Sequence, residues 1–330
     1  MITGLGTAYM DSTPIVAITG QVPTGLLGRD GFQESDVFGI SMPVTKHNYL
    51  ITDIRDLPMA IKEAFYIAQT GRPGPVLIDV CKDVQQASME FDYPVEVNLP
   101  GYHPNQNEPE PVAIKRAARL LNEAKKPLII AGQGVSIAKA ERELRQLAEI
   151  ANIPVATSLL GIGTFPSTHP LSISWGGMHG EAYTNFAMQE CDVLFAVGAR
   201  LDDRLTGAFE TFAPKARIIH ADLDPAEMNK NLTIDTPVVG DALLTMRELL
   251  SHIQPNEHPA WIEQIEEWKA DSNERDILAQ ETDELIAPYI MRELWHATDE
   301  GECTVVSDVG QHQMWEAQYF RHTKRRSLLT

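Results

Sequence analysis

The sequence predicts an α/β protein built on parallel sheets. Short apolar runs alternate with amphipathic stretches of helical period, which is the pattern of βαβ units. The 330 residues also exceed what one hydrophobic core usually supports, so we expect two or more domains. The expected strands are, in order, residues 14–20, 74–80, 126–132, 153–157, 192–198, 216–222, 236–241 and 303–308. Helical periodicity covers residues 56–70, 111–124, 137–151, 180–190, 241–253, 259–280 and 287–298.

These elements group into three blocks. The middle block, 111–255, has five strands with their helices and can form a complete domain. The first block, 1–90, and the last, 286–330, have too few strands to close a core. Between the blocks lie a linker rich in proline and acids, 91–110, and a charged linker helix, 256–285. Because both outer blocks are incomplete, we expect the chain to be an internal fragment of a longer polypeptide.

Charge and composition exclude several classes of function. With 46 acidic and 27 basic side chains the net charge is −19, which leaves no broad basic face for nucleic acid or an anionic membrane. The one basic run, 321–326, is expected to be a solvated loop. The sequence has no membrane-span or signal-peptide pattern, so we expect a cytoplasmic protein, or an organellar one in a eukaryote. Three widely spaced cysteines, Cys81, Cys191 and Cys303, fit buried reduced thiols and no metal site.

The most informative segment is DVLFAVGARLDDRLTG, residues 192–207, in which an apolar strand runs into a glycine and a charged turn. A strand this apolar is normally covered on both faces, and its carboxyl end opens onto the crevice where α/β sheets bind ligands. The turn therefore predicts a ligand site, with a helix N-cap plus a surface ion pair as the alternative. Its charged residues are Arg200, Asp202, Asp203 and Arg204.

Two glycine-rich turns in the middle block can approach a phosphate. Gly132 and Gly134 follow a strand, where bare backbone and helix amides bind anions. An ordinary tight turn explains them equally well, because Ile137 breaks the dinucleotide fingerprint. The GGMHG motif precedes a helix and presents Met178 and His179, although a lone histidine is more often structural.

Acidic residues end another strand of the middle block. Asp222 stands where an acid can accept hydrogen bonds from ribose hydroxyls. Asp224 is better explained as the cap of a short helix that begins at Pro225. Because all these loops follow successive strands, we expect them to converge on one crevice that holds a large nucleotide cofactor.

The first block adds a polar loop and two cations. Phe32 and Gln33 lie in the loop after the first strand, while Arg72 and Lys82 flank the second strand. A cation at the carboxyl end of a strand suits an anionic substrate such as a small carboxylate. The alternatives are an ion pair between Lys82 and Asp83, and a helix C-terminal role for Arg72.

The last block offers one further turn. Gly310, Gln311 and His312 lie at a strand-to-helix junction, which can bind a diphosphate through backbone amides. In the alternative interpretation Gln311 and Met314 are the first turn and the core face of that helix.

Taken in order, the motifs resemble those of the large catalytic subunit of acetohydroxyacid (acetolactate) synthase, a thiamine-diphosphate enzyme that also carries FAD. Seven motifs in register make the resemblance specific, and it implies a three-domain parallel-sheet architecture: the latter part of a pyrimidine-binding domain over 1–90, a complete Rossmann-like FAD-binding domain over 111–255, and the start of a diphosphate-binding domain over 286–330. The matching motifs are AITGQVPT (17–24), FQESD (32–36), TKH (45–47), GRPGPVLID (71–79) with KDV (82–84), GMHG (177–180), VGARLDDRLTG (197–207) and DVGQHQMW (308–315).

The resemblance also assigns residues to sites. It places the carboxylate of the second keto acid at Arg204, and the substrate channel at Phe32, Gln33 and Lys82. The positions that match FAD contacts are Arg72, Gly132, Gly134, Leu159, Met178, His179, Gly198, Arg200, Asp202, Asp222 and Asp241. The phosphate contacts of thiamine diphosphate match Val309, Gly310, Gln311 and His312.

In such enzymes the thiamine cofactor carries the chemistry and FAD is structural. The resemblance implies a transferase that joins pyruvate to a second pyruvate or to 2-ketobutyrate with loss of CO₂. This is the first common step of branched-chain amino acid biosynthesis, toward isoleucine and valine.

Two parts of the family's active site are missing from this sequence. The glutamate that activates the cofactor lies upstream of Met1 in the family's order, and the acidic Mg²⁺ site lies downstream of Thr330. The resemblance therefore predicts that these residues alone are inactive. Cys81 is a smaller departure, because the family has proline before the position of Lys82.

The resemblance implies a homodimer of large subunits, with a tetramer and a small regulatory subunit as further options. Two alternatives stay open. Another thiamine-diphosphate enzyme, of the pyruvate oxidase or glyoxylate carboligase type, would lack the pairing of FQE with ARLDDR. A non-catalytic flavin-nucleotide-binding module would bind flavin without thiamine diphosphate. A purely structural or regulatory partner has no specific support beyond the acidic helix.

Overall fold

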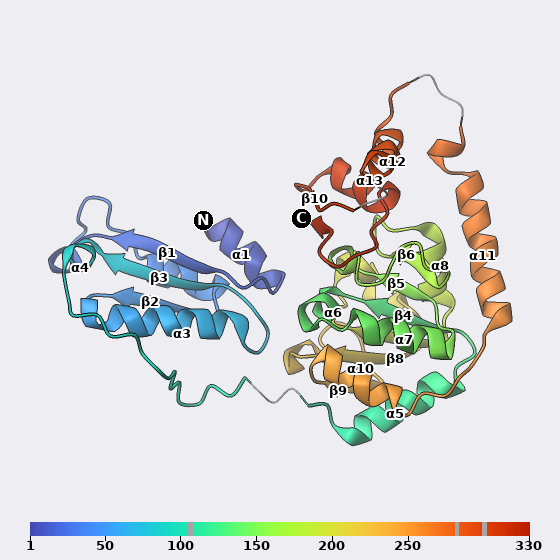
Figure 1. The fold of residues 1–330 in the computed structure, drawn as a ribbon, viewed down its shortest axis with the longest axis horizontal. Coiled ribbons are helices and arrows are strands. Elements are labelled where there is room, and N and C mark those ends of the chain that lie inside the picture. Colours follow the sequence, from blue (N-terminus) through green and yellow to red (C-terminus); the bar gives the residue numbers. More distant parts are fainter. Residues whose placement is uncertain (105–107, 281–283, 299–301) are drawn as a thin grey trace. The chain divides into compact units, whose positions relative to one another are not determined.

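The computed structural model describes residues 1–104, 108–280, 284–298 and 302–330 (Figure 1). The chain divides into two compact units, residues 1–106 and 107–330. Parts of the predicted linker, of the predicted linker helix and of the last block lie outside the described residues, namely 105–107, 281–283 and 299–301.

The first unit is a three-stranded parallel sheet in the order β1–β3–β2. Its strands are β1 (Val16–Gln21), β2 (His47–Ile51) and β3 (Val76–Cys81), and its helices are α1 (Ile2–Met10), α2 (Val37–Ser41), α3 (Leu57–Gln69) and α4 (Lys82–Gln86). β3 is central and buried along its whole length, and α3 packs against it through Ala60 and Ala64. The sequence pattern missed β2, because His47 and Asn48 interrupt its apolar character.

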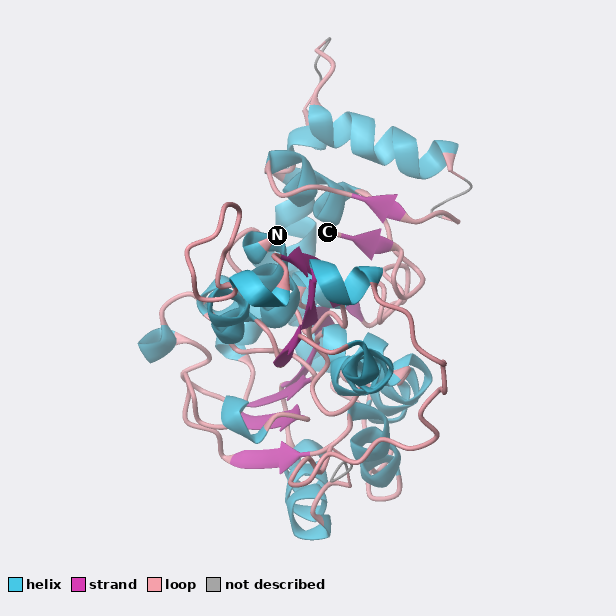
Figure 2. Cartoon of the chain, turned by 90° about the vertical axis from the view of Figure 1, so that its left-hand side faces the viewer, coloured by secondary structure: helices cyan, strands magenta, loops and turns pink. Residues whose placement is uncertain are grey.

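The second unit is built on a six-stranded parallel sheet in the order β6–β5–β4–β7–β8–β9. Numbered from the first strand of the sheet, this is the doubly wound order 3-2-1-4-5-6. The strands are short (magenta in Figure 2): β4 (Pro127–Ala131), β5 (Val155–Thr157), β6 (Ser172–Trp175), β7 (Val193–Val197), β8 (Arg217–Asp222) and β9 (Thr236–Val239). The α/β class with parallel sheets is therefore confirmed.

Helices cover both faces of this sheet. They are α5 (Pro111–Glu123), α6 (Gln133–Ala138), α7 (Glu141–Ala151), α8 (Ala182–Glu190), α9 (Asp203–Thr206), α10 (Ala242–Leu250) and α11 (Pro259–Glu274). Side chains alternate between the faces of a strand. Ile129 and Phe195 accordingly join the core under α5, α7 and α10, whereas Leu128 and Leu194 join the core under α8 and α11. Short 3₁₀ helices occupy Thr24–Leu26, Met42–Val44, Ile54–Asp56, Leu159–Gly161, Phe209–Thr211, Pro225–Glu227 and Ile277–Ala279.

α11 falls within the predicted linker helix, yet it contributes to the core of the second unit. Trp261 and Ile265 are each 1% exposed. The indole Nε1 of Trp261 donates to the carbonyl of Pro127 at 3.0 Å, and the ammonium of Lys126 lies over the indole ring. The apolar residues recur only once per helical turn in a charged sequence, so the sequence pattern did not distinguish a core helix from a solvated one.

The end of the chain packs with the second unit instead of forming a unit of its own. It contains α12 (Ala287–Ala297), β10 (Val305–Val306), α13 (Gln311–Tyr319) and β11 (Leu328–Leu329). β10 and β11 pair in parallel over two residues each, and a ladder this short cannot build a core.

Two further elements differ from expectation. β6 was not predicted, because SISW is short and polar. The predicted helix 137–151 is two helices, α6 and α7, with Lys139 between them in the left-handed region at φ +58°. In the parts of the chain that the structure describes, no helix combines the length and apolar character that a bilayer crossing requires.

Candidate functional site

The strand order of the second unit fixes where a ligand can bind. β4 and β7 are neighbours at the centre of the sheet, and the chain leaves them in opposite directions. In open α/β sheets the crevice at this point, outside the carboxyl ends of the strands, is the usual ligand site. Gly132 and Gly134 follow β4, while Gly198 and Arg200 follow β7, so the structure brings both predicted turns to this crevice.

The glycines of the two turns let their backbones touch. The amide of Gly132 donates to Val197 O at 3.0 Å, and the amide of Gly134 donates to Gly198 O at 2.9 Å. A Cβ on Gly132 would lie 2.1 Å from Gly198 O, and Gly198 itself has a left-handed φ of +58°. The turn after β5 joins the same contact, since a Cβ on Gly161 would lie 2.2 Å from Ala131 O. It carries Leu159.

The GGMHG loop is held against α9 at the same edge. The amide and carbonyl of Gly177 are both bound by the side chain of Asn185, at 2.9 Å each. The amide of Met178 donates to Arg204 O at 2.8 Å, and Nη1 of Arg204 lies 3.2 Å from the sulfur of Met178. The Met178 side chain stays 55% exposed, so the loop presents a thioether and His179 at the rim.

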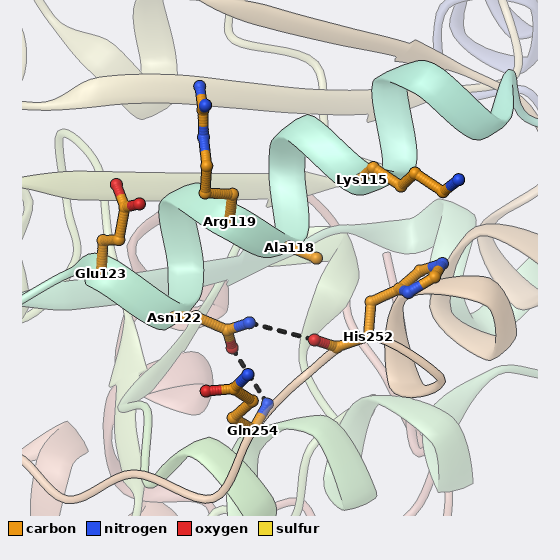
Figure 3. Close-up of a pocket in the computed structure, with 7 residues that line it drawn as sticks. All are labelled: Lys115, Ala118, Arg119, Asn122, Glu123, His252 and Gln254. Atoms are coloured by element: carbon orange, nitrogen blue, oxygen red, sulfur yellow. Dashed lines mark hydrogen bonds between the residues drawn. The ribbon is translucent and has the colours of Figure 1, made fainter.

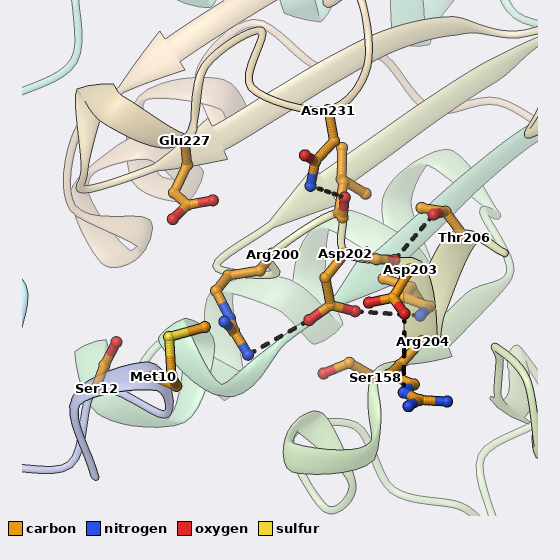
Figure 4. A network of polar contacts seen from close by, with 12 residues as sticks. Met10, Ser12, Ser158, Arg200, Asp202, Asp203, Arg204, Thr206, Glu227 and Asn231 are labelled. Atoms are coloured by element: carbon orange, nitrogen blue, oxygen red, sulfur yellow. Dashed lines mark hydrogen bonds and ion pairs between the residues drawn. The ribbon is translucent and has the colours of Figure 1, made fainter. Parts of the chain in front are cut away.

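The charged turn forms the local contacts of its alternative interpretation. Arg200 Nη2 lies 3.3 Å from Asp202 Oδ2, and Asp202 Oδ1 accepts from the amide of Leu205, which caps α9 (Figure 4). Arg204 is 3.9 Å from Asp203, with both side chains about 70% exposed, so this pair contributes little to stability. These contacts orient the turn, and the two guanidinium groups remain partly open to solvent beside the crevice.

The acids at the other strand ends have different roles. Asp222, at the end of β8, accepts from the amide of Asp224 at 2.9 Å. Asp224 caps the 3₁₀ helix that begins at Pro225, as its alternative interpretation predicted. Asp241 caps α10 by accepting from the amides of Leu243 and Leu244. The structure therefore gives Asp241 and Asp224 helix-capping roles. Asp222 caps none of the described helices and is the last residue of β8.

Two titratable residues near this edge were missed. His220 in β8 is 1% exposed and its Nε2 lies 2.9 Å from Ala199 O, so it supports the turn that carries Arg200. Burial lowers the pKa of His220 and favours the neutral ring. Burial, reinforced by the charge of Asp276, raises the pKa of Glu181 to about 7. The sequence signal for His220 was a histidine inside the apolar run ARIIHAD. No sequence signal marked Glu181, because the neighbouring Asp276 is distant in sequence.

In the first unit, the predicted channel residues follow neighbouring strands. Phe32 and Gln33 lie in the loop after β1, with Phe32 91% exposed and Gln33 in the left-handed region at φ +68°. Lys82 begins α4 directly after β3. Since β1 and β3 are parallel neighbours, these residues share the carboxyl edge of the sheet. Asp83 accepts from the amide of Thr24 at 3.0 Å and not from Lys82 as the alternative proposed.

Arg72 lies elsewhere in the first unit. Its Nε donates to Ser12 Oγ at 2.9 Å and its Nη2 contacts Met10 O at 3.4 Å, at the end of α1. The alternative role of a helix C-terminal cation is therefore realised, although on α1 and not on the helix that precedes it in sequence.

The predicted diphosphate turn precedes α13. The helix begins at Gln311, with Gln311 and His312 exposed and Val309 77% exposed. Gly310 is extended, at φ 165°. Gln318, further along α13, donates to the carbonyl of His179 at 3.0 Å, so the helix contacts the GGMHG loop.

The remaining candidate features carry no chemistry at this edge. Cys81 and Cys191 are buried as expected, and burial raises the pKa of Cys191 to about 12, whereas Cys303 is only half-buried. Across the described ranges, no group of three or more His, Cys, Asp or Glu side chains could hold a metal ion. A separate pocket lies on α5 (Figure 3), lined by Lys115, Ala118, Arg119, Asn122, Glu123, His252 and Gln254.

The chain matches one family model and several known proteins. Residues 114–249 match the model of the thiamine pyrophosphate enzyme central domain. Over its whole length the chain is 45% identical to a probable acetolactate synthase large subunit of Methanocaldococcus jannaschii and 44% identical to the acetolactate synthase large subunit of Corynebacterium glutamicum. Over 98% of its length it is 43% identical to the acetolactate synthase isozyme 3 large subunit of Escherichia coli.

The chain is a homologue of acetolactate synthase large subunits. The resemblance inferred from the motifs is thereby confirmed. The chain covers 57%, 53% and 58% of these three acetolactate synthase subunits, so it spans just over half their length. The matched central domain coincides with the six-stranded sheet that carries the switch-point crevice.

Proposed function

We propose that this sequence is part of a thiamine-diphosphate-dependent acetolactate synthase, which joins pyruvate to a second 2-keto acid with release of CO₂. The acceptor is pyruvate or 2-ketobutyrate, in the biosynthesis of valine and isoleucine. The observation that carries the proposal is the identity of 43–45% to acetolactate synthase subunits over 98–100% of the chain. The crevice between β4 and β7 supports it, because several loops converge there on partly exposed cations.

We further propose that the second unit binds FAD at this crevice as a structural cofactor. The close contact of Gly132 with Gly198 brings the turns after β4 and β7 together at the switch point, where sheets of this order bind dinucleotides. Arg200 supplies a positive charge beside it, and Asp222 supplies an acceptor for ligand hydroxyls. Asp202 and Asp241 act through the caps that hold α9 and α10. Arg72 belongs to the first unit, and its part in FAD binding stays a proposal.

Arg204 is the proposed clamp for the carboxylate of the acceptor keto acid. Its guanidinium is oriented by the sulfur of Met178, a neutral and weak acceptor, and its exposed ion pair with Asp203 at 3.9 Å is weak enough to give way to a ligand carboxylate. A planar guanidinium can bind a carboxylate through two hydrogen bonds, which fixes both position and orientation.

Thiamine diphosphate would supply the carbanion chemistry of pyruvate decarboxylation. The turn Val309–Gly310–Gln311–His312 would bind its phosphates, and Phe32, Gln33 and Lys82 would line the substrate channel. We propose that the acidic Mg²⁺ ligands and the activating glutamate come from other parts of a longer polypeptide, because the chain spans just over half the length of its relatives. We propose homodimers or tetramers of the large subunit, together with a small regulatory subunit.

FAD binding can be tested on the 330-residue chain by following the quenching of flavin fluorescence. We expect the wild-type chain to bind FAD and Arg200→Ala to bind it more weakly. Arg217→Ala removes an exposed cation at the opposite, amino end of β8 and serves as the matched control. Absence of FAD binding, or an equal loss in both variants, would contradict the proposed site.

The activity test needs the complete polypeptide, which is defined by reading the gene on both sides of codons 1 and 330. With thiamine diphosphate, Mg²⁺ and FAD it is expected to form acetolactate from pyruvate, whereas the 330-residue chain forms none. Acetolactate from the shorter chain would refute the second expectation. A complete polypeptide that binds FAD but not thiamine diphosphate would indicate the flavin-binding module instead.

A further inference from the structure

Three polar side chains near the end of the chain form a buried cluster that the proposed chemistry does not use. His322 is 1% exposed, Glu316 is 2% exposed and Ser327 is 4% exposed. Nε2 of His322 lies 2.6 Å from Glu316 Oε1, and Nδ1 lies 2.8 Å from Ser327 Oγ. The basic run 321–326 is an exposed loop at Arg321, Lys324, Arg325 and Arg326, as expected, and His322 is its one buried member.

The hydrogen bonds tie the ring of His322 to both of its neighbours. Ser327 Oγ donates its single hydrogen to Lys324 O at 2.6 Å, so Nδ1 of His322 donates to Ser327 Oγ. Nε2 of the same ring is hydrogen-bonded to Glu316 Oε1. Each ring nitrogen therefore has a buried partner, and removal of the imidazole leaves Glu316 and Ser327 buried without it.

The cluster joins α13 to the body of the second unit. Glu316 belongs to α13, whereas the backbone carbonyl of His322 accepts from the amide of Ser167 at 2.9 Å. Gly163, in the left-handed region at φ +84°, would place a Cβ 2.1 Å from Lys324 O. The backbone of the segment around His322 therefore packs directly against the backbone of the loop between β5 and β6.

The same segment makes a second attachment through Arg325. Its Nη1 donates to the carbonyl of Ser136 in α6 at 3.2 Å, and its Nε lies 3.6 Å from Glu141 at the start of α7. α6 begins at the turn after β4, which forms one side of the crevice. The segment around His322 is thus attached to the loop after β5 and to α6 and α7, which precede β5. His322 links this attached segment to α13.

We infer that His322 is a positioning residue: the buried hydrogen-bonded bridge from Glu316 through His322 to Ser327 holds α13, and with it the turn Gly310–Gln311–His312, in place against the central domain. The inference rests on the proposed function of that turn in thiamine diphosphate binding. Gln311 lies little more than one helical turn from Glu316, so a tilt of the helix at its buried anchor displaces the turn directly.

Hydrogen exchange on the 330-residue chain tests the bridge. We expect His322→Ala to accelerate amide exchange in 311–319 about tenfold, the factor that corresponds to 1.4 kcal/mol of opening free energy, while exchange in β4 stays unchanged. His296→Ala, which removes an exposed histidine of α12, is the matched control. Unchanged exchange in 311–319, or equal acceleration in β4, would overturn the inference.

Two conservative variants separate the two bonds of the bridge. His322→Gln can retain a donor near the position of Nε2 and His322→Asn one near Nδ1, so each is expected to restore part of the protection. Labelling histidine with ¹⁵N supplies a spectroscopic signature, because NMR identifies which ring nitrogen carries a hydrogen-bonded proton. A His322 ring without such a proton on Nδ1, or rescue by neither variant, would refute the bridge.

Thiamine diphosphate with Mg²⁺, added to the complete polypeptide, distinguishes this inference from the proposed function. If the turn binds the cofactor, added thiamine diphosphate slows exchange in 309–319 of the complete wild-type polypeptide, and His322→Ala raises its apparent Kd about tenfold with FAD binding unchanged. If the cofactor has no effect on the wild type, the role of the turn in cofactor binding fails. The variants without cofactor still decide whether His322 holds α13.

Discussion

Nη1 of Arg204 lies 3.2 Å from the sulfur of Met178, which joins α9 to a loop 26 residues earlier in the sequence. The backbones meet as well, because the amide of Met178 donates to Arg204 O at 2.8 Å. The side chain of Arg204 is nevertheless 72% exposed. The guanidinium is therefore oriented at the rim of the crevice without being covered.

In the complete polypeptide, Arg204→Ala is expected to lower kcat/KM for the acceptor keto acid roughly 10- to 100-fold, the loss expected for charge-assisted hydrogen bonds to a carboxylate. Arg204→Lys keeps the charge but loses the planar group that can make two hydrogen bonds to a carboxylate, so its activity should lie between those of Arg204→Ala and the wild type. Met178→Leu keeps the volume of the side chain and should have a smaller effect. Steady-state kinetics with the acceptor varied measures these changes. An unchanged kcat/KM in Arg204→Ala would exclude the clamp.

Gly132→Ala is expected to destabilise the second unit by about 1–3 kcal/mol, because the added methyl would overlap the backbone oxygen of Gly198 and neither backbone can move freely. Urea unfolding followed by tryptophan fluorescence measures the change. Gly25→Ala is the control, since a Cβ there meets nothing within 4 Å. Equal stabilities of the two variants would show that the contact between the two turns is loose.

Glu181→Gln is expected to stabilise the chain at pH 8 by about 3 kcal/mol and to have little effect near pH 4. The pKa of Glu181 is raised from 4.5 to about 7 in the folded chain, so the folded state holds its proton more tightly than the unfolded state does. Stability is therefore lost as the pH rises from about 4.5 to 7, and the neutral amide avoids that loss. Denaturation at several pH values measures it.

Glu190→Gln is the control for this prediction, and its sign is opposite. Glu190 lies at the end of the same helix, and its hydrogen bonds to Lys215 lower the pKa of its carboxyl group. Its contribution is present at high pH and is lost as the pH falls, so Glu190→Gln should not stabilise the chain at pH 8. If both variants respond alike, burial is not the cause of the effect at Glu181.

Trp261→Ala is expected to cost about 3–5 kcal/mol, because it removes a fully buried side chain and a hydrogen bond to Pro127. Ile277→Ala, at a 44% exposed position just beyond α11, should cost less than about 1 kcal/mol. Thermal or urea unfolding measures both. Similar small costs would restore the interpretation of α11 as a solvated linker.

The central sheet could be predicted from the sequence because its strands are buried on both faces. Runs such as PLIIA and VLFAV stand out from the polar turns that follow them. β2 and β6 were missed because His47, Asn48 and Ser172 bring polar side chains into short strands that only their neighbours in the sheet define. The core role of α11 depends on contacts with residues far away in the sequence, which no local pattern records.

The site could be predicted only in part, for a related reason. The turns after β4 and β7 were found from their glycines and charges, and the topology brings them together. The support from His220 to Ala199 O and the bridge through His322 depend on burial, which the sequence does not state. Local pairing with the backbone explains Asp224 and Asp241, and such caps look like ligand residues when only the sequence is read.

The contact between Gly134 and Gly198 sets the width of the crevice floor through main-chain atoms alone. Exposed side chains such as Arg204 and Met178 take no part in that main-chain contact, so substitutions at the rim leave it in place. A lineage can therefore exchange one ligand for another by changing residues such as Arg200 and Met178, provided that the two glycines are kept. Redesign of the proposed ligand site should begin from the same division between a fixed floor and a variable rim.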